Sequence, residues 1–558
     1  MGDRWRAAGT LGRVPRPRLV ASALAACAAI ALAGLGVQVS GTADVAGAAG
    51  ASLGAPPATG GDQQVSSPEP EAEPPSPPPN VIVILTDDLD SSLVPYLPNV
   101  TGLIRDQGAE LTNFYVEQSS CCPSRASILS GLYAHNHGVI GNVWPAGGYD
   151  RWKETEQDND LPVWLERAGY RNALLGKYFN EYPYHPGSQL SEAEKTERRE
   201  YVPPGWQSWA SPAQGNAYAQ THYKLNVDGQ LDTDFHEDYL DRWLGDRALS
   251  LVDGADGFDF AAGGQFLYYA SYSPHTPYAY PPEYEDQFTD ATYPRTPDFN
   301  EADVSDKFGQ TRTRARLSTT DKAVIDETFR ERIRSLQVLD QTVGQLVHEL
   351  AAEGALDHTY LIFTSDNGYH MGNHRREIGK YTQFQNDVSV PFYVRGPGIA
   401  PGSTYDTLAG NIDIAPTIAD IAGASAPADV DGLSLLPLLH GEAPPTRRYF
   451  LLGRALTPTN TTTEGGLEEA PETYVESRRS SRLNDFTGVT NGRYKLIRYT
   501  HLPHEELYDL HNDPFELDNL LANDEASYQA MTPAGRRAVD TLRAALDRLV
   551  DCSGVSCQ

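Results

Sequence analysis

Basic residues and cysteines are scarce in this sequence of 558 residues. Lys and Arg total 44 against 75 Asp and Glu, which leaves a formal net charge of −31 at pH 7. Because nucleic-acid phosphates are bound by a basic face, we expect no nucleic acid as a partner. The cysteines number five, too few for a disulfide scaffold. The length allows one large domain and a smaller one with ample core.

The first 48 residues have the pattern of an export signal. Several arginines precede an apolar run from Leu19 to Val37, and residues 46–48 (AGA) offer a small-residue cleavage site. The run is also long enough to remain as a membrane anchor, and residues 24–27 (LAAC) resemble a lipoprotein box. Cleaved export is the first interpretation, a membrane tether the second and lipidation the third. We therefore expect a protein that is secreted or tethered to the outer face of the cell membrane.

Two further features lie on either side of the predicted folded part. Residues 49–79 are rich in Pro, Ala and Gly and end in SSPEPEAEPPSPPP, so we expect a disordered linker that buries no core. At the other end of the chain, Cys552 and Cys557 are close enough to form a small disulfide loop if the protein is exported.

Short apolar runs separated by helical patterns indicate the fold class. Val81–Leu85 (VIVIL) predicts a strand buried on both faces, and similar runs recur at 173–175, 266–270 and 360–364. An apolar stripe over 321–352 predicts a long helix. We expect residues 80–444 to form an α/β domain with a mostly parallel sheet flanked by helices.

The texture of the sequence changes after residue 444. Residues 491–500 (NGRYKLIRYT) predict a hairpin strand, and residues 532–550 predict an amphipathic helix. A polar loop is expected over 458–473. We therefore predict a smaller C-terminal α+β domain over 445–558.

The run CCPSR, from Cys121 to Arg125, combines a sulfur residue, a helix start and an arginine. Pro123 suits the first turn of a helix, which places Cys121 just before a helix N-terminus, where free N–H groups and the macrodipole favour an anion. Arg125, one turn in, offers a planar fork of donors to an oxyanion. Together these features predict an anion-transfer site.

Two acidic motifs follow predicted strands. Asp87 and Asp88 come after the first strand, and Asp366 and Asn367 follow the strand at 360–364. Ligand sites in open α/β sheets lie beyond the carboxyl ends of the strands, and adjacent aspartates repel each other unless a cation lies between them. This all-oxygen set suits Ca²⁺ or Mg²⁺ rather than Zn²⁺.

The run CCPSR followed by ASILSG resembles the sulfatase signature Cys-x-Pro-Ser-Arg, whose first cysteine is oxidised to formylglycine. The doublet Cys121-Cys122 and residues 135–137 (HNH) resemble the motifs of the N-acetylglucosamine-6-sulfatase and heparan endosulfatase branch. Residues 411–423 (NIDIAPTIADIAG) and the YDL and NDP motifs at 508–514 resemble other shared segments. The resemblance spans about residues 80 to 520.

Several expectations follow from this resemblance. It implies an alkaline-phosphatase-like α/β fold and hydrolysis of sulfate monoesters, on sulfated sugars such as 6-O-sulfated glucosamine. It further implies that Cys121 is converted by the formylglycine-generating enzyme during maturation, and that the modified residue joins the acidic motifs around Ca²⁺, with Mg²⁺ as the alternative. The metal ligands are then Asp87, Asp88, Cys121, Asp366 and Asn367.

The resemblance also assigns roles in catalysis. One hydroxyl of the hydrated aldehyde attacks the sulfur, while Arg125, Lys177 and Lys380 hold the sulfate oxygens. His275, in the SPH motif, and Lys380 are the candidates to protonate the departing alcohol. The second hydroxyl then loses its proton and sulfate is expelled. In many arylsulfatases a histidine lies two residues after the lysine that corresponds to Lys177. Here that position is Phe179, so the group that takes this proton is left open.

The roles of the HNH histidines and the class of activity also stay open. His135 and His137 are as well explained by helix-end packing as by substrate contact. Within the same superfamily, the runner-up activity is phosphodiester or phosphonate hydrolysis. From another class, the rival is a catalytically dead, exported glycan-binding protein in which Cys121 stays a thiol. Endo or exo action on a glycan is not decided by the sequence.

Overall fold

The computed structural model describes residues 77–443, 447–453 and 485–558. These residues belong to one compact unit. The predicted export signal, nearly all of the linker and the polar loop at 458–473 lie outside the described residues. Among the described helices, none has both the length and the apolar character needed to cross a bilayer.

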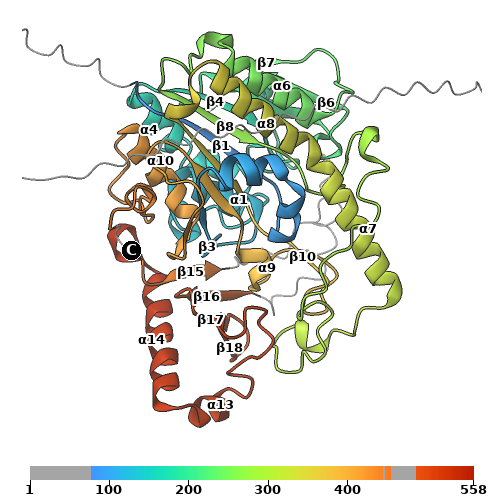
Figure 1. Cartoon of the computed structure of the whole chain (residues 1–558), viewed down its shortest axis with the longest axis vertical. Helices are drawn as coiled ribbons and strands as arrows, with labels where there is room; N and C mark the ends of the chain where they lie inside the picture. The colour runs from blue at the N-terminus through green and yellow to red at the C-terminus, as the bar shows by residue number, and fades with distance from the viewer. Residues whose placement is uncertain (1–76, 444–446, 454–484) are drawn as a thin grey trace, which may run out of the picture. The chain divides into compact units, whose positions relative to one another are not determined.

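A ten-stranded sheet forms the centre of the α/β part (Figure 1). The five strands in its middle are mutually parallel, and the strands towards both edges include antiparallel pairs, which confirms the predicted mostly parallel sheet. In order across the sheet the strands are β13 (Ser403–Tyr405), β2 (Ala109–Leu111), β12 (Phe392–Arg395), β9 (Thr359–Ser365), β1 (Asn80–Thr86), β8 (Gln265–Ala270), β4 (Arg171–Gly176), β5 (Ser208–Gly215), β6 (Tyr223–Val227) and β7 (Gln230–Leu231).

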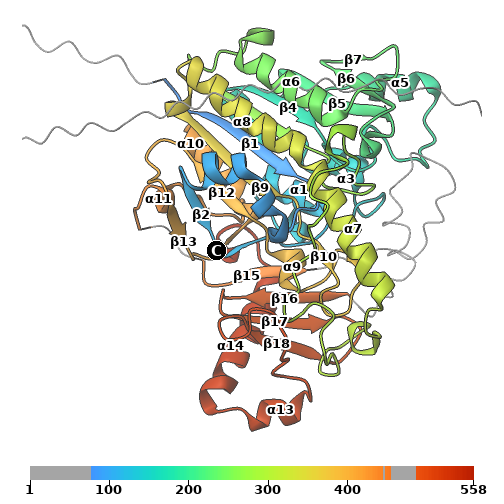
Figure 2. The same ribbon diagram turned by 45° about the vertical axis from the view of Figure 1, so that its right-hand side comes forward.

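Helices cover both faces of this sheet, which explains why β1 is apolar throughout its middle. Val81 and Val83 contact the core that includes α1 (Cys121–Ser130), α4 (Leu161–Arg167) and α10 (Ile414–Ala422). Ile82 points to the opposite core, which includes α6 (Leu240–Val252), α7 (Thr319–Ser335) and α8 (Gln337–Ala352). Figure 2 shows α6 and α8 side by side over that face.

The long helix predicted over 321–352 is divided in the structure. Helix α7 ends at Ser335 and α8 begins at Gln337. At Leu336 between them, the N–H donates to the carbonyl of Ile333, three residues back rather than four. A locally tightened turn therefore separates two helices that share one apolar stripe.

The C-terminal part has its own antiparallel sheet. Its strands are β15 (Phe450–Gly453), β16 (Phe486–Thr490), β17 (Tyr494–Tyr499) and β18 (Glu505–Asp509), and α14 (Pro533–Leu549) lies along one side (Figure 1). The predicted strand at 491–500, the amphipathic helix and the Cys552–Cys557 disulfide are all confirmed. A domain boundary at residue 445 stays a prediction.

The parallel strands deliver the predicted site residues to one edge of the sheet. Asp87 follows β1, Lys177 follows β4, Asp366 follows β9, and β8 leads to the turn that carries His275. Because these strands run in the same direction, their carboxyl ends meet. The positions of these side chains therefore follow directly from the topology.

Gly176, immediately before Lys177, permits the close pairing of β4 with β8. Its φ is +101°, and a Cβ there would lie 2.0 Å from the carbonyl oxygen of Ala270. We expect Gly176→Ala to cost a further ~1–3 kcal/mol of unfolding free energy beyond the backbone strain. Gly169 is the matched control, since its φ is +89° but a Cβ there meets open space. Urea unfolding of both variants measures the difference, and equal losses of stability would contradict the predicted clash.

Candidate active site

Helix α1 places Cys121 at its own N-terminus. The sequence predicts Cys121 just before the helix, whereas the structure makes it the first helical residue, with extended Ser120 preceding it. Pro123 lies in the first turn as predicted, and Gly131 ends the helix in a left-handed conformation at φ +71°. All ten residues of α1 are buried, so the Cys121 side chain faces a site inside the protein.

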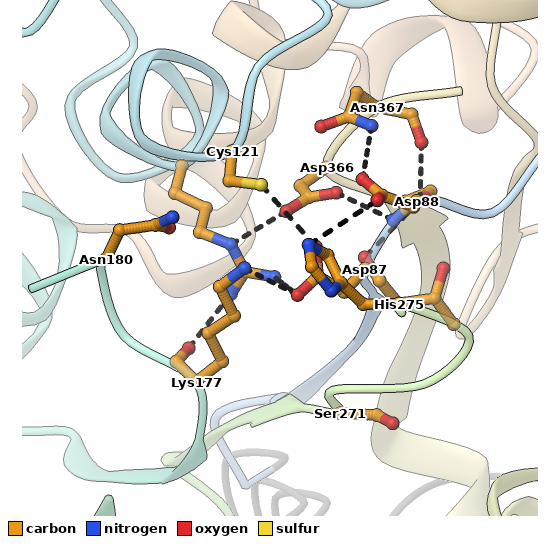
Figure 3. A network of polar contacts seen from close by, with 12 residues as sticks. Asp87, Asp88, Cys121, Lys177, Asn180, Ser271, His275, Asp366 and Asn367 are labelled. Atoms are coloured by element: carbon orange, nitrogen blue, oxygen red, sulfur yellow. Dashed lines mark hydrogen bonds and ion pairs between the residues drawn. The ribbon is translucent and has the colours of Figure 1, made fainter. Parts of the chain in front are cut away.

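The acidic motifs converge beside Cys121 (Figure 3). The backbone N–H of Asp88 donates to Asp366 Oδ1 at 3.1 Å, and Asn367 Nδ2 donates to Asp88 Oδ1 at 2.7 Å. Asp87 Oδ1 lies 3.6 Å from Cys121 Sγ. Two strand ends that are far apart in the sequence thus form one cluster with the cysteine.

Each buried carboxylate of the cluster is paired with a buried cation. Lys177 Nζ lies 2.5 Å from Asp87 Oδ2, Lys380 Nζ lies 2.5 Å from Asp88 Oδ1, and Arg125 Nε lies 2.9 Å from Asp366 Oδ2. Three carboxylates therefore face three cations, which makes the burial of each charge tolerable. Lys380 Nζ is also 3.0 Å from Cys121 Sγ, so this lysine reaches the centre of the site.

His275 enters the cluster from the turn after β8. Its Nδ1 donates to the carbonyl of Thr276 at 2.8 Å, since a carbonyl only accepts. Its Nε2 lies 3.6 Å from Asp88 Oδ2. The backbone thus fixes the ring with Nε2 towards the site, where a proton could be carried.

The surroundings shift the pKa values of three acidic groups in different directions. Burial alone would raise the pKa of Asp88, but Lys380 and His275 outweigh it and hold that pKa below its usual range. Burial and the neighbouring Asp87 raise the pKa of Asp366 to about 6. Burial also raises the pKa of the Cys121 thiol well above its ordinary value, despite Lys177 and Lys380. An unmodified Cys121 would therefore remain a thiol, which is a poor nucleophile.

The donor set fits a divalent cation. Asp88 Oδ2 and Asn367 Oδ1 are buried oxygens that have no hydrogen-bond partner among the described residues, and buried polar atoms of this kind call for an explanation such as an ion. Carboxylate oxygens of Asp87 and Asp88 lie within 4.8 Å of Cys121 Sγ and of a His275 ring nitrogen. Oxygen ligands of this type suit Ca²⁺ or Mg²⁺.

The structure brings together every residue predicted for the site, but the HNH histidines lie elsewhere. His137 Nε2 lies 3.2 Å from Ser127 Oγ, and His135 Nε2 donates to the carbonyl of Cys552 at 2.9 Å. These contacts agree with the packing interpretation. Phe179 packs in the core, where it stacks on Trp152 with ring centroids 5.0 Å apart.

Two residues that support the site carry no clear mark in the sequence. Arg332, fully buried on α7, donates to the carbonyl of Asp88 and lies 3.0 Å from Asp90 Oδ2. Asp241 on α6 accepts hydrogen bonds from Ser271 Oγ at 2.7 Å and Ser273 Oγ at 2.6 Å, which steadies the turn before His275. A basic residue in the apolar stripe of α7 was the available signal for Arg332, while nothing local marked Asp241.

Comparisons with known proteins point to one family. The family model described as Sulfatase matches residues 79–424. The chain is 32% identical to human N-acetylglucosamine-6-sulfatase over 462 residues, which covers 79% of this chain and 80% of the relative. It is 34% identical over 366 residues to a putative extracellular sulfatase Sulf-1 homolog of Caenorhabditis elegans, covering 64% of this chain and 49% of that protein.

Solved structures confirm the alkaline-phosphatase-like fold. A protein solved in complex with its substrate, D-glucosamine-2-N,6-O-disulfate, superposes with a TM-score of 0.66 at 20% identity, over 85% of this chain and 98% of the other. A phosphonate monoester hydrolase of Agrobacterium radiobacter has a TM-score of 0.60 at 21% identity, over 84% and 95%. At these identities the likeness concerns the fold alone.

The family model covers more than half of the chain, and the human relative is matched along most of both sequences. The predicted resemblance, including that to the N-acetylglucosamine-6-sulfatases, is thereby confirmed. The chain belongs to the sulfatase family, the enzymes that hydrolyse sulfuric esters.

Proposed function

We propose that this protein is an exported sulfatase that hydrolyses sulfate monoesters on sulfated sugars, with 6-O-sulfated glucosamine as the favoured substrate unit. The observation that carries the proposal is the position of Cys121 Sγ, at a helix N-terminus and among three buried cations and three buried carboxylates. Such a site suits an anion that must be held while it is transferred.

Two groups complete the site in this proposal. Asp87, Asp88, Asp366, Asn367 and the modified residue 121 would hold a calcium ion, with magnesium as the alternative. The formylglycine made from Cys121 supplies the nucleophile and the ion supplies positive charge beside it.

The protein's own cations bind and orient the sulfate. Arg125 Nη2 is buried and has no hydrogen-bond partner within the described part of the chain, so it has donor capacity left for a sulfate oxygen. Lys177 and Lys380 present ammonium groups near Cys121, and the N–H groups at the start of α1 add partial positive charge. Because all these donors are fixed before substrate arrives, they need little reorganisation as charge develops on the sulfate oxygens.

Proton transfer to the departing alcohol is assigned to His275 or Lys380. The hydrogen bond from His275 Nδ1 to the Thr276 carbonyl keeps Nε2 directed at the site, where it can hold a proton at that atom. Lys380 lies closer to residue 121, at 3.0 Å. Phe179 stacks on Trp152 and a phenyl ring has no atom that accepts a proton, so the group that removes the proton in the last step is left open.

The proposed substrate and location rest on relatives and on the sequence. The human relative is named N-acetylglucosamine-6-sulfatase, and the solved structure with TM-score 0.66 contains a 6-O-sulfated glucosamine as substrate. Export is supported by the N-terminal sequence pattern, by the Cys552–Cys557 disulfide and by relatives named extracellular sulfatases.

The modification at residue 121 is tested by mass spectrometry of protein from its native host. We expect the tryptic peptide Asp106–Arg125 to carry an aldehyde at position 121 and a thiol at 122. We expect Cys121→Ala to lower turnover of 4-nitrophenyl sulfate by about 10⁴-fold or more, as removal of a nucleophile does elsewhere. Cys122→Ala, one residue along and equally buried, is the matched control and should keep measurable turnover. An intact thiol at 121 in active protein would refute the proposed nucleophile.

The metal assignment is tested by calorimetry on chelator-treated protein. Asn367→Ala removes the unpartnered Oδ1, so we expect calcium binding to weaken by about tenfold or more. Asn226→Ala is the control, because Asn226 is a fully buried asparagine of β6, far across the sheet. That variant should lose stability but bind calcium normally. If Asn367→Ala binds calcium as tightly as the unaltered protein, Asn367 is not a ligand.

Substrate class is tested with a panel of esters under one set of conditions. We expect glucosamine 6-sulfate and its N-sulfated and N-acetylated forms to have kcat/KM values at least about tenfold above those of other sulfated sugars, because a site built for one sulfate position leaves polar groups unpaired with another. Aryl phosphonates and phosphate diesters serve as comparison substrates. Faster turnover of phosphonates than of every sulfate ester would overturn the proposal.

A further inference from the structure

Lys380 is carried by a segment that has little regular structure of its own. It follows the two-residue strand β11 (Ile378–Gly379), and the short helix α9 (Gln385–Val388) begins five residues later. A lysine has a long and flexible stem, so the distances of 2.5 Å from its Nζ to Asp88 and 3.0 Å to Cys121 depend on where the backbone holds it. The contacts of residues 380–388 therefore bear on the chemistry.

One side of this segment is held by the α/β part. The Asp387 carboxylate accepts hydrogen bonds from the Thr382 N–H at 2.8 Å and from Thr382 Oγ1 at 2.6 Å. His370 Nδ1 lies 2.9 Å from the same carboxylate. All three residues are buried. The α/β part also holds both ends of the segment: Gly379 pairs with His370, and the N–H groups of Gly368 and Val116 donate to the carbonyls of Asp387 and Val388 at 2.9 and 2.8 Å. The stretch between these ends takes further bonds from the C-terminal part.

The other side is held by charged residues of the C-terminal part. Lys495 on β17 donates from Nζ to the carbonyl of Gln383 at 2.5 Å. Glu516 forms an ion pair with Lys495 and accepts the N–H of Gln385 at 2.7 Å. Lys495 is 0% exposed and Glu516 is 1% exposed. The buried Lys495–Glu516 pair is thus hydrogen-bonded to the main chain of Gln383 and Gln385, three and five residues after Lys380.

Glu506 on β18 forms further hydrogen bonds to the same segment. Its Oε2 accepts from the Gln383 side-chain amide at 3.0 Å, and its Oε1 accepts the N–H of Phe308 at 2.7 Å. Tyr499 on β17 accepts from the same Gln383 amide at 2.9 Å. Gln383 is therefore bound by the C-terminal sheet through both its backbone carbonyl and its side chain.

Stability alone is a weak explanation for this arrangement. A buried ion pair often contributes no more stability than apolar residues of similar size, but it specifies one geometry, because any displacement leaves a buried charge unpaired. Here the specified geometry is that of the backbone that carries Lys380. The YDL and NDP motifs lie in the same stretch of sequence as Glu506 and Glu516, although the catalytic domain has its own core.

We propose that Lys495, Glu506 and Glu516 are positioning residues for Lys380, so that the C-terminal sheet forms part of the catalytic apparatus without contacting the substrate. This inference rests on the proposed function and deepens it. Their hydrogen bonds hold Gln383 and Gln385, and through these residues they set the position of the Lys380 ammonium beside residue 121.

The first test compares Lys495→Met with Arg498→Met in full-length protein containing formylglycine. Both residues lie on β17, but Arg498 is partly exposed and pairs with Glu505 and Asp547, outside the Lys380 segment. For Lys495→Met we expect kcat on 4-nitrophenyl sulfate to fall about 100-fold, the cost of a small misplacement of a catalytic group, with KM changed far less. For Arg498→Met we expect kcat within about twofold of the unaltered protein. Equal kcat values for the two variants would overturn the proposal.

A double-mutant cycle then separates positioning from a general structural effect. If Lys495 acts through Lys380, adding Lys495→Met to Lys380→Met should lower kcat by less than about threefold further. A further loss as large as that of Lys495→Met alone would mean that Lys495 acts independently of Lys380, and the proposal would fail. The thermal midpoint of each variant is measured in parallel.

Glu506→Gln provides a milder variant should Lys495→Met not fold, because it keeps the size of the side chain while removing its charge. We expect the same pattern, a loss in kcat that disappears in the Lys380→Met background. An unaltered protein that hydrolyses neither the aryl sulfate nor glucosamine 6-sulfate would defeat the proposed function itself. Turnover by the unaltered protein combined with additive losses in the cycle would defeat only this inference.

Discussion

The site depends on the neutralisation of a cluster of carboxylates at the carboxyl ends of parallel strands. Asp87, Asp88 and Asp366 are all buried, and three like charges so close together would repel strongly in a low-dielectric interior. Arg125, Lys177 and Lys380 balance them one for one. Arg125 Nη1 also donates to the carbonyl of Lys177 at 2.9 Å, which links two of these cations.

This balance also explains how a strongly acidic protein can accept an anionic substrate. The six buried charges cancel, so a divalent ion bound in the cluster would leave a net positive charge beside Cys121. A sulfate monoester would then meet a local positive field although the whole chain carries −31. Burial strengthens that field, since solvent and salt screen it little. The acidity of the rest of the surface is compatible with this because screening weakens it over distance.

Much of the site could be predicted because its residues lie next to elements that the sequence marks clearly. Asp87 and Asp366 directly follow buried strands, and parallel strands bring such ends together whatever the loops do. Pro123 marked the start of α1 to within one residue. The resemblance then added Lys177, His275 and Lys380, which lie in loops where no periodicity would have marked them.

The remaining features depend on contacts between distant parts of the chain. Arg332 and Asp241 reach the site from helices whose apolar patterns mark only their packing faces. The hydrogen bond from Lys495 to the Lys380 segment joins residues far apart in the sequence. A lysine in a predicted strand is ordinarily expected to be exposed, so nothing in the sequence indicated this bond. The division between α7 and α8 was invisible because both helices share one stripe.

The central claim is that a modified residue 121 and a divalent ion share one site with these carboxylates. Its most direct test is a crystal structure of protein from the native host, grown with calcium. We expect an ion in contact with Asp88 Oδ2 and Asn367 Oδ1, and an aldehyde or its hydrate at residue 121. The claim would be contradicted by an intact thiol at 121 and no ion bound at saturating calcium, with the carboxylates still paired only with the lysines.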